Sequence, residues 1–117
     1  MTKMGGLAIA TQLALNKVFA LQPRLEQAIL FGSRAKGNYR NGSDIDLVLV
    51  GDELSIQDLL ALELAIDELL LPYRVDMVLK HHIDNPDLLA HIERVGLPFY
   101  RRDPHASTHE IVVALQS

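Results

Sequence analysis

Two aspartates stand inside a short apolar stretch that otherwise has the composition of a buried strand. Asp44 and Asp46 alternate with Ile45 and Leu47 and precede the apolar residues 48–50. A carboxylate is costly to bury unless a positive charge compensates it. Side chains alternate between the two faces of a strand, so both aspartates lie on one face. The pair therefore indicates a cation site, and a divalent metal ion is the obvious candidate.

A third aspartate, Asp76, stands at the corresponding position of a later apolar stretch, residues 74–79. Carboxylates at about 4 Å repel one another by about 1 kcal/mol per pair in water and about 4 kcal/mol at an effective dielectric near 20. Magnesium removes this repulsion because it binds carboxylate and phosphate oxygens together. Two such ions can hold a nucleoside triphosphate and an attacking hydroxyl in line.

A glycine–serine pair precedes the aspartates and offers a phosphate site. Gly32 and Ser33 follow the apolar residues 27–31, and Arg34 and Lys36 come directly after them. Backbone N–H groups at a helix start, together with a hydroxyl, favour an anion. The two cations add positive charge. The pair alone is only mildly specific, because Gly-Ser is also a common way into a helix, and the P-loop pattern is absent.

Each aspartate also has an ordinary structural interpretation. Asp44 can be a turn residue, and Asp46 can be a charge that protects an edge strand. The second alternative fits poorly, because the strand around Asp46 is apolar on both faces and has the pattern of a central strand. Asp76 gains its weight from the match with Asp46. The histidines, including His91, are interpreted as surface residues.

The remaining pattern predicts the elements that position these residues. Helices are expected over 7–21, from Ser33 to Lys36, from Ser55 as cap to the residue before Pro72, and from Asp84 or Asn85 as cap to Val95. Strands are expected at 27–31, 44–50 and 74–79, with a short edge strand at 97–100. The tail is ambiguous between a capped helix and a strand.

The site itself constrains the topology. A glycine at the end of the first strand meets aspartates at the start of the second only if these strands are antiparallel. The third strand carries Asp76 near its start, so it is expected to lie parallel to the second, with a right-handed helical crossover. The fold class is therefore α/β or α+β, with a small mixed sheet flanked by helices.

The length, net charge and cysteine content of the chain restrict its possible functions. The chain has 117 residues, which predicts one domain over 1–117, with a core of about 7–100 and a tail at 103–117. The net charge of −4 argues against a strong nucleic-acid footprint. Cysteine is absent, and neither a signal peptide nor a membrane-spanning run is recognised, so a cytoplasmic location is expected.

The combined pattern resembles the minimal nucleotidyltransferases of the DNA polymerase β superfamily, which include the antitoxin-type partners of HEPN-domain proteins. The resemblance spans about residues 7–100 and rests on the Gly-Ser pair, the two alternating aspartates and the third aspartate. It implies that Gly32 and Ser33 hold the triphosphate, with Arg34 and Lys36 as further phosphate contacts. It also implies the catalytic metal ligands: Asp44, Asp46 and Asp76. Of these, Asp76 helps to deprotonate the acceptor hydroxyl.

The resemblance implies transfer of a nucleoside monophosphate, AMP from ATP, to a hydroxyl, with two magnesium ions and release of pyrophosphate. Little of the chain is left to recognise the acceptor, so a second subunit is expected in a hetero-oligomer. The family points to a HEPN-type helical partner with a tyrosine as acceptor, and to this chain as antitoxin and protein adenylyltransferase. The alternative is a non-catalytic nucleotide-binding module that neutralises its partner by contact. A phosphohydrolase is disfavoured, since its nucleophilic aspartate ends a strand whereas Asp44 begins one.

Overall fold

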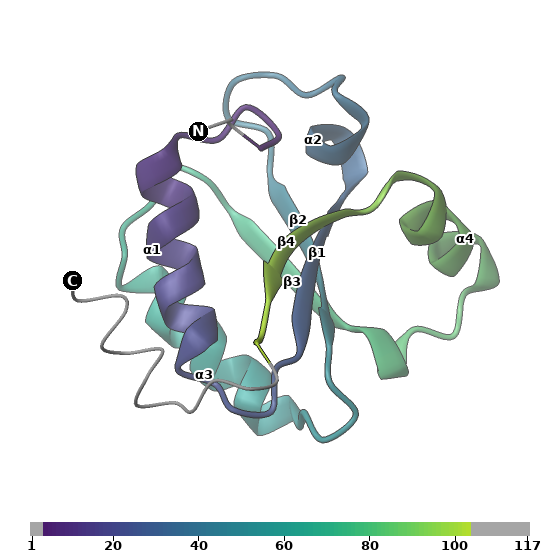
Figure 1. Cartoon of the computed structure of the whole chain (residues 1–117). Helices are drawn as coiled ribbons and strands as arrows, with labels where there is room; N and C mark the ends of the chain where they lie inside the picture. Colours follow the sequence, from purple (N-terminus) through teal and green to yellow (C-terminus); the bar gives the residue numbers. More distant parts are fainter. Residues whose placement is uncertain (1–3, 104–117) are drawn as a thin grey trace.

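The computed structural model describes residues 4–103 and contains one four-stranded sheet of order β3-β2-β1-β4 (Figure 1). The elements in chain order are α1 (Ile9–Ala20), β1 (Gln27–Phe31), α2 (Gly32–Lys36), β2 (Ile45–Val50), α3 (Ile56–Asp67), β3 (Val75–Leu79), the 3₁₀ turn η1 (Lys80–His82), α4 (Pro86–Val95) and β4 (Leu97–Arg101). The predicted order of helices and strands is confirmed.

The sheet is mixed, with the strand directions that were predicted from the positions of the glycine and the aspartates. β1 pairs antiparallel with β2 and with β4, whereas β3 pairs parallel with β2. The helix α3 makes the connection between the two parallel strands. The prediction of an α+β fold with a small mixed sheet is therefore confirmed.

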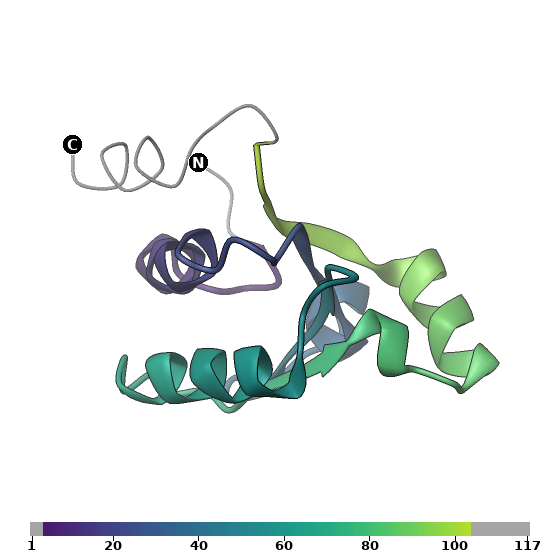
Figure 2. The ribbon, with the colours of Figure 1, turned by 90° about the horizontal axis from the view of Figure 1, so that it is seen from below.

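The helices cover the two faces of the sheet unequally. Figure 2 shows α1 and α3 on one side of the sheet and α4 on the other. The main core lies on the α1 and α3 side, where Phe19 and Leu62 pack with Ile45 and Leu47 of β2. Because side chains alternate along β2, Asp46 points to the opposite face, the one that carries α4.

Local signals explain most of the helix ends. Ser55 caps α3 by accepting a hydrogen bond from the N–H of Asp58, whose carboxylate accepts one from the N–H of Ser55. Asn85, one of the two predicted caps, accepts from the N–H of Asp87 at the start of α4. The expected cap at Ser33 is wrong, since α2 begins at Gly32 and has no side-chain cap.

The helix α3 ends at Asp67, several residues before Pro72, where the sequence predicted its end. Leu70 has a φ of 53°, in the left-handed region. The chain thereby leaves the helix axis, and Leu69 and Leu71 pack against the core. Burial of these two side chains therefore takes precedence over continuation of the helix. The tail after Asp103 lies outside the described residues.

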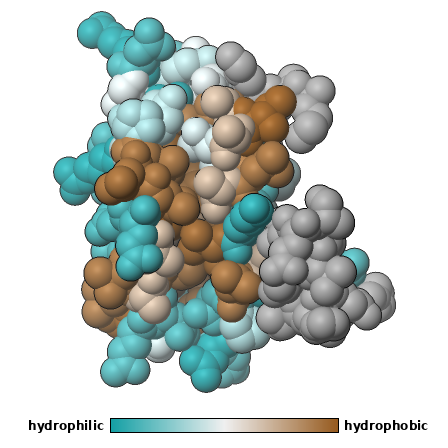
Figure 3. All heavy atoms as spheres, turned by 90° about the vertical axis from the view of Figure 1, so that its left-hand side faces the viewer, coloured by the Kyte–Doolittle hydropathy of each residue, from teal (hydrophilic) through white to brown (hydrophobic). Residues whose placement is uncertain are grey.

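The outer sides of α1 and α3 carry exposed aliphatic side chains, which we call the outer apolar face: Leu13, Leu21, Ile56, Leu60 and Leu64. Figure 3 shows apolar side chains gathered on this side of the molecule. The α3 members recur every four residues, so they form one stripe, and each is between 51% and 67% exposed. No helix in residues 4–103 is long and apolar enough to cross a membrane.

Candidate active site

Two of the predicted aspartates lie side by side in the sheet. Asp46 of β2 is the register partner of Asp76 of β3 in the parallel ladder. Neighbouring strands are about 4.8 Å apart, and equivalent residues of a parallel pair point to the same face. The structure therefore brings these two carboxylates together on the face that carries α4.

The pKa of Asp46 reflects its burial and the nearby negative charges. Burial raises the pKa of the Asp46 carboxyl above its ordinary value of 3.8, and the negative charges of Asp76 and Asp44 raise it further. In the described part of the chain no salt bridge compensates Asp46. A bound cation would favour the ionised carboxylate and lower this pKa again.

The other two aspartates are more open. Asp44 is exposed and lies one residue before β2. The Asp76 side chain is 41% exposed, and its Oδ1 accepts a hydrogen bond from Nε of Arg74 at 3.0 Å. Such an exposed pair contributes little free energy.

The donor set suits a hard cation, although the side chains are not yet gathered around it. Among residues 4–103, no three His, Cys, Asp or Glu side chains already form a group that could hold a metal ion. Carboxylate oxygens are nevertheless the ligands that magnesium prefers. The chemistry of the residues therefore fits magnesium.

Gly32 brings the end of β1 directly against Asp46. Its φ is +72°, in the left-handed region, and a Cβ built there would lie 2.4 Å from Oδ2 of Asp46. Phe31, the residue before it, is the register partner of Asp46. Only glycine fits this approach without strain. The Gly-Ser pair and the aspartates therefore share one end of the sheet, as the sequence predicted.

Arg34 has a different role from the predicted one. The residue is 3% exposed, and its guanidinium donates to the carbonyl of Ser43 at 3.0 Å and to that of Gly5 at 2.8 Å. The guanidinium lies 5.1 Å from the ring centre of Tyr39 and 4.8 Å from that of Tyr73. Arg34 therefore ties surrounding segments together, and we correct the expectation that it contacts phosphate. Lys36 is exposed at the last position of α2 and stays a predicted phosphate contact.

We expect Arg34→Met to lower the free energy of unfolding by about 2–4 kcal/mol, since two carbonyls lose a charged donor and two rings lose a cation. Chemical denaturation measures this change. Arg40→Met is the matched control, because Arg40 is exposed and its hydrogen bonds to Ser43 are made by its backbone N–H and C=O, which the substitution keeps. Equal losses in the two variants would contradict the structural role of Arg34.

One residue at this end of the sheet, His91, was not predicted as part of the site from the sequence. His91 of α4 is half-buried, and its Nε2 accepts a hydrogen bond from the N–H of Gly32 at 3.4 Å. Its ring also meets that of Phe31 edge-on, with 6.2 Å between the centres. The interpretation of His91 as a surface residue is therefore wrong. The spacing of Leu88, His91 and Val95 was the available signal, because it places His91 on the inward side of the helix.

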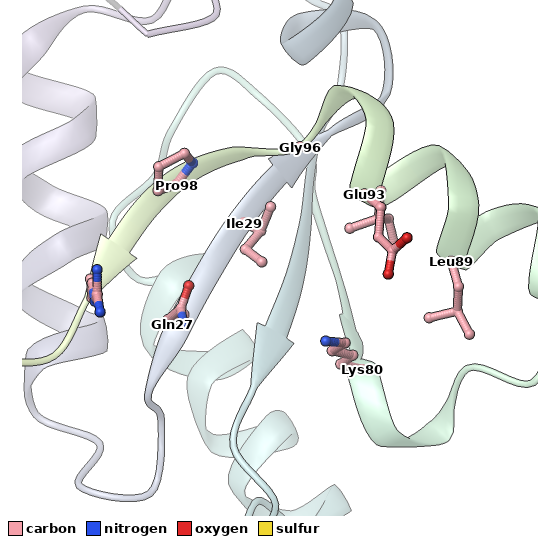
Figure 4. Close-up of a pocket in the computed structure, with 9 residues that line it drawn as sticks. Gln27, Ile29, Lys80, Leu89, Glu93, Gly96 and Pro98 are labelled. Atoms are coloured by element: carbon pink, nitrogen blue, oxygen red, sulfur yellow. The ribbon is translucent and has the colours of Figure 1, made fainter.

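A cavity of about 350 Å³ opens on the same side of the sheet, between α4 and the strands β1 and β4 (Figure 4). Ile29 and Leu89 line its apolar part, and Lys80 and Glu93 bring charges. It reaches Gln27, at the end of β1 far from Gly32. None of the predicted site residues lines it.

Several solved structures with the same fold are described as toxin–antitoxin proteins. One, described as a toxin–antitoxin with AMP-PNP, is 20% identical with a TM-score of 0.63, over 90% of this chain and 83% of that one. A second, a complex of MNT antitoxin with the tri-AMPylated HEPN toxin of Shewanella oneidensis, is 22% identical with a TM-score of 0.54, over 91% and 89%. A third, the toxin–antitoxin MntA–HepT, is 21% identical with a TM-score of 0.54, over 90% and 81%. At these identities the likeness shows the fold alone.

A comparison with curated proteins finds no match. The model of the family described as polymerase beta, nucleotidyltransferase, in contrast, matches residues 14–105. This range is most of the chain and includes the Gly-Ser pair and all three aspartates. The chain therefore belongs to the polymerase β nucleotidyltransferase family.

Proposed function

We propose that this chain transfers AMP from ATP to a hydroxyl group on a protein, with magnesium as cofactor, in the cytoplasm. The observation that carries the proposal is the pairing of Asp46 with Asp76 in the sheet, with Gly32 packed directly against Asp46. Membership of the nucleotidyltransferase family supports the reaction class. The raised pKa of Asp46 supports a cation at this place, because no salt bridge among residues 4–103 compensates this carboxylate.

Each residue has a defined part in the proposed transfer. The N–H of Gly32 and the hydroxyl of Ser33 hold the triphosphate. Asp44, Asp46 and Asp76 would hold magnesium, which would supply positive charge that offsets the charge of the phosphates. The carboxylate of Asp76 takes the proton of the acceptor hydroxyl while its oxygen forms a bond to the α-phosphorus. The bond from that phosphorus to the bridging oxygen breaks, and pyrophosphate leaves with the electron pair.

A HEPN-type helical protein is the proposed partner, one of its tyrosines is the acceptor, and this chain is the antitoxin. The described neighbours support this choice, since they are toxin–antitoxin complexes. The outer apolar face supports a protein partner, because exposed apolar patches mark protein interfaces. This face lies on the other side of the sheet from the aspartates. The surface that docks the partner is therefore different from the site that receives the acceptor tyrosine.

Labelled ATP tests the reaction. With magnesium and the partner, the wild-type chain is expected to label the partner, and the double variant Asp44→Asn, Asp46→Asn is expected not to. Equal labelling by both proteins would remove the catalytic assignment. The rival function, neutralisation by contact alone, requires that the unlabelled partner is still fully neutralised by the double variant.

Docking is testable separately from transfer. We expect the double variant Leu60→Glu, Leu64→Glu to weaken association with the partner on the order of 100-fold, because it places two charges within an apolar interface. Calorimetric titration measures this affinity, and ATP affinity is expected to stay unchanged. Leu97→Glu is the control, since Leu97 is a 37% exposed leucine on β4. Equal weakening by the control would refute docking on the outer apolar face.

A further inference from the structure

The structure fixes His91 beside the phosphate end of the site. Gly96 ends α4 so close to β1 that a Cβ on it would lie 2.8 Å from Cγ2 of Ile29. The ring of His91 packs edge-on against that of Phe31, at an interplanar angle of 81°. The imidazole is therefore held by its own helix and by the last residue of β1.

In the hydrogen bond between Gly32 and His91, the backbone N–H of Gly32 is the donor and Nε2 of the imidazole is the acceptor. An Nε2 that accepts from an amide carries a lone pair and no proton there. The same amide is the first of α2 and is the one that the proposed function gives to the triphosphate. A phosphate oxygen that accepts from this N–H must take the place of the imidazole nitrogen, because both need the same direction from the amide.

We propose that His91 sets the affinity of the site for triphosphate by competing with it for the Gly32 N–H. This inference rests on the proposed function, since it assumes that the triphosphate uses this amide. Binding of the triphosphate therefore releases His91 from the amide. In the ligand-free chain the imidazole of His91 occupies the Gly32 N–H, and it competes with the triphosphate for this donor.

Two substitutions separate the hydrogen bond from the packing. His91→Phe keeps a ring against Phe31 but has no acceptor, whereas His91→Gln keeps an acceptor oxygen. We expect His91→Phe to bind magnesium–ATP about two- to tenfold more tightly, which is the net value of one lost competing hydrogen bond. We expect His91→Gln to bind as the wild type does. Calorimetric titration under conditions without the acceptor protein measures the dissociation constants.

Two further measurements exclude a merely structural effect. The amide ¹H and ¹⁵N resonances of Gly32 in the ligand-free chain are expected to shift in His91→Phe and to stay near their wild-type positions in His91→Gln. His81→Phe is the control for a surface histidine, because His81 is exposed in η1, after the end of β3. It is expected to change neither the affinity nor the Gly32 resonances.

The possible results distinguish failure of the competition by His91 from failure of the proposed function. Unchanged or weaker ATP binding by His91→Phe, with normal binding by the wild type, overturns the competition and leaves the proposed function standing. Tighter binding by both His91→Phe and His91→Gln also overturns it, because the acceptor would then be irrelevant. Absence of ATP binding by the wild type removes the proposed function and this inference together.

Discussion

Replacing Asp46 by asparagine is expected to reduce AMP transfer on the order of 10³-fold or more, because the variant loses a charged ligand where the phosphates need positive charge. Asp46 is the aspartate that the fold fixes most firmly, since it lies within β2, between Phe31 of β1 and Asp76 of β3. Asparagine has the same shape and keeps the strand. The loss is therefore expected in the turnover rate and in magnesium dependence, and not in folding. Labelled ATP with the partner measures it.

The same substitution is expected to stabilise the magnesium-free chain at pH 7. The pKa of Asp46 is raised in the folded chain, so the folded state binds a proton more tightly than the unfolded state does. Stability from this proton is fully present below about pH 3.8, the ordinary value, and is lost as the pH rises through the folded pKa. The ionised carboxylate therefore destabilises the fold at pH 7, and Asp46→Asn relieves this. The difference between the proteins is expected to close in acid.

Magnesium and ATP are expected to reverse the order of stability. A ligand at 100 times its dissociation constant stabilises the fold by about 2.7 kcal/mol, and only the wild type binds it well. Asp52→Asn is the matched control, because Asp52 is an exposed aspartate beyond the opposite end of β2. Thermal unfolding with and without magnesium–ATP measures all three proteins. A wild type that gains no stability from the pair of ligands would contradict the metal site.

The strands and their faces were predictable because they rest on local patterns. The alternation of Asp46 with Ile45 and Leu47 defines which face is charged, and the need to bring the glycine to the aspartates defines the strand directions. The capping box at Ser55 and the proline at 86 are equally local. Each signal lies within a few residues, so a single sequence was sufficient.

The roles of Arg34 and His91 were not predictable in this way. Arg34 is buried because carbonyls and rings from Gly5, Ser43, Tyr39 and Tyr73 surround it, and these contacts depend on the folding of separate segments. The bond of His91 joins residues 59 positions apart. The family resemblance, with the local positive charge, gave a phosphate contact for Arg34, and the helix position gave a surface residue for His91. Contacts between distant parts of the chain give both residues a different role.

Gly32→Ala is the second substitution with a large expected effect. Its methyl group would meet Oδ2 of Asp46 at 2.4 Å in a left-handed backbone conformation. Either the turn at the end of β1 opens or the carboxylate moves, and both changes separate the phosphate amide from Asp46. We expect loss of detectable ATP binding and a fall of about 2–3 kcal/mol in the free energy of unfolding, from the backbone strain and the contact together.

Gly37→Ala isolates the steric part of this effect. Gly37 also has a left-handed backbone, with φ of +86°, but no atom lies within 4 Å of the position of its Cβ. Its alanine variant therefore carries the backbone strain without the contact, and we expect it to lose about 1 kcal/mol and to keep ATP binding. Denaturation and calorimetric titration of both variants measure the comparison. If Gly32→Ala bound ATP as tightly as Gly37→Ala does, the steric contact with Asp46 would not affect ATP binding. The close approach of β1 to Asp46 would then have no part in holding the triphosphate.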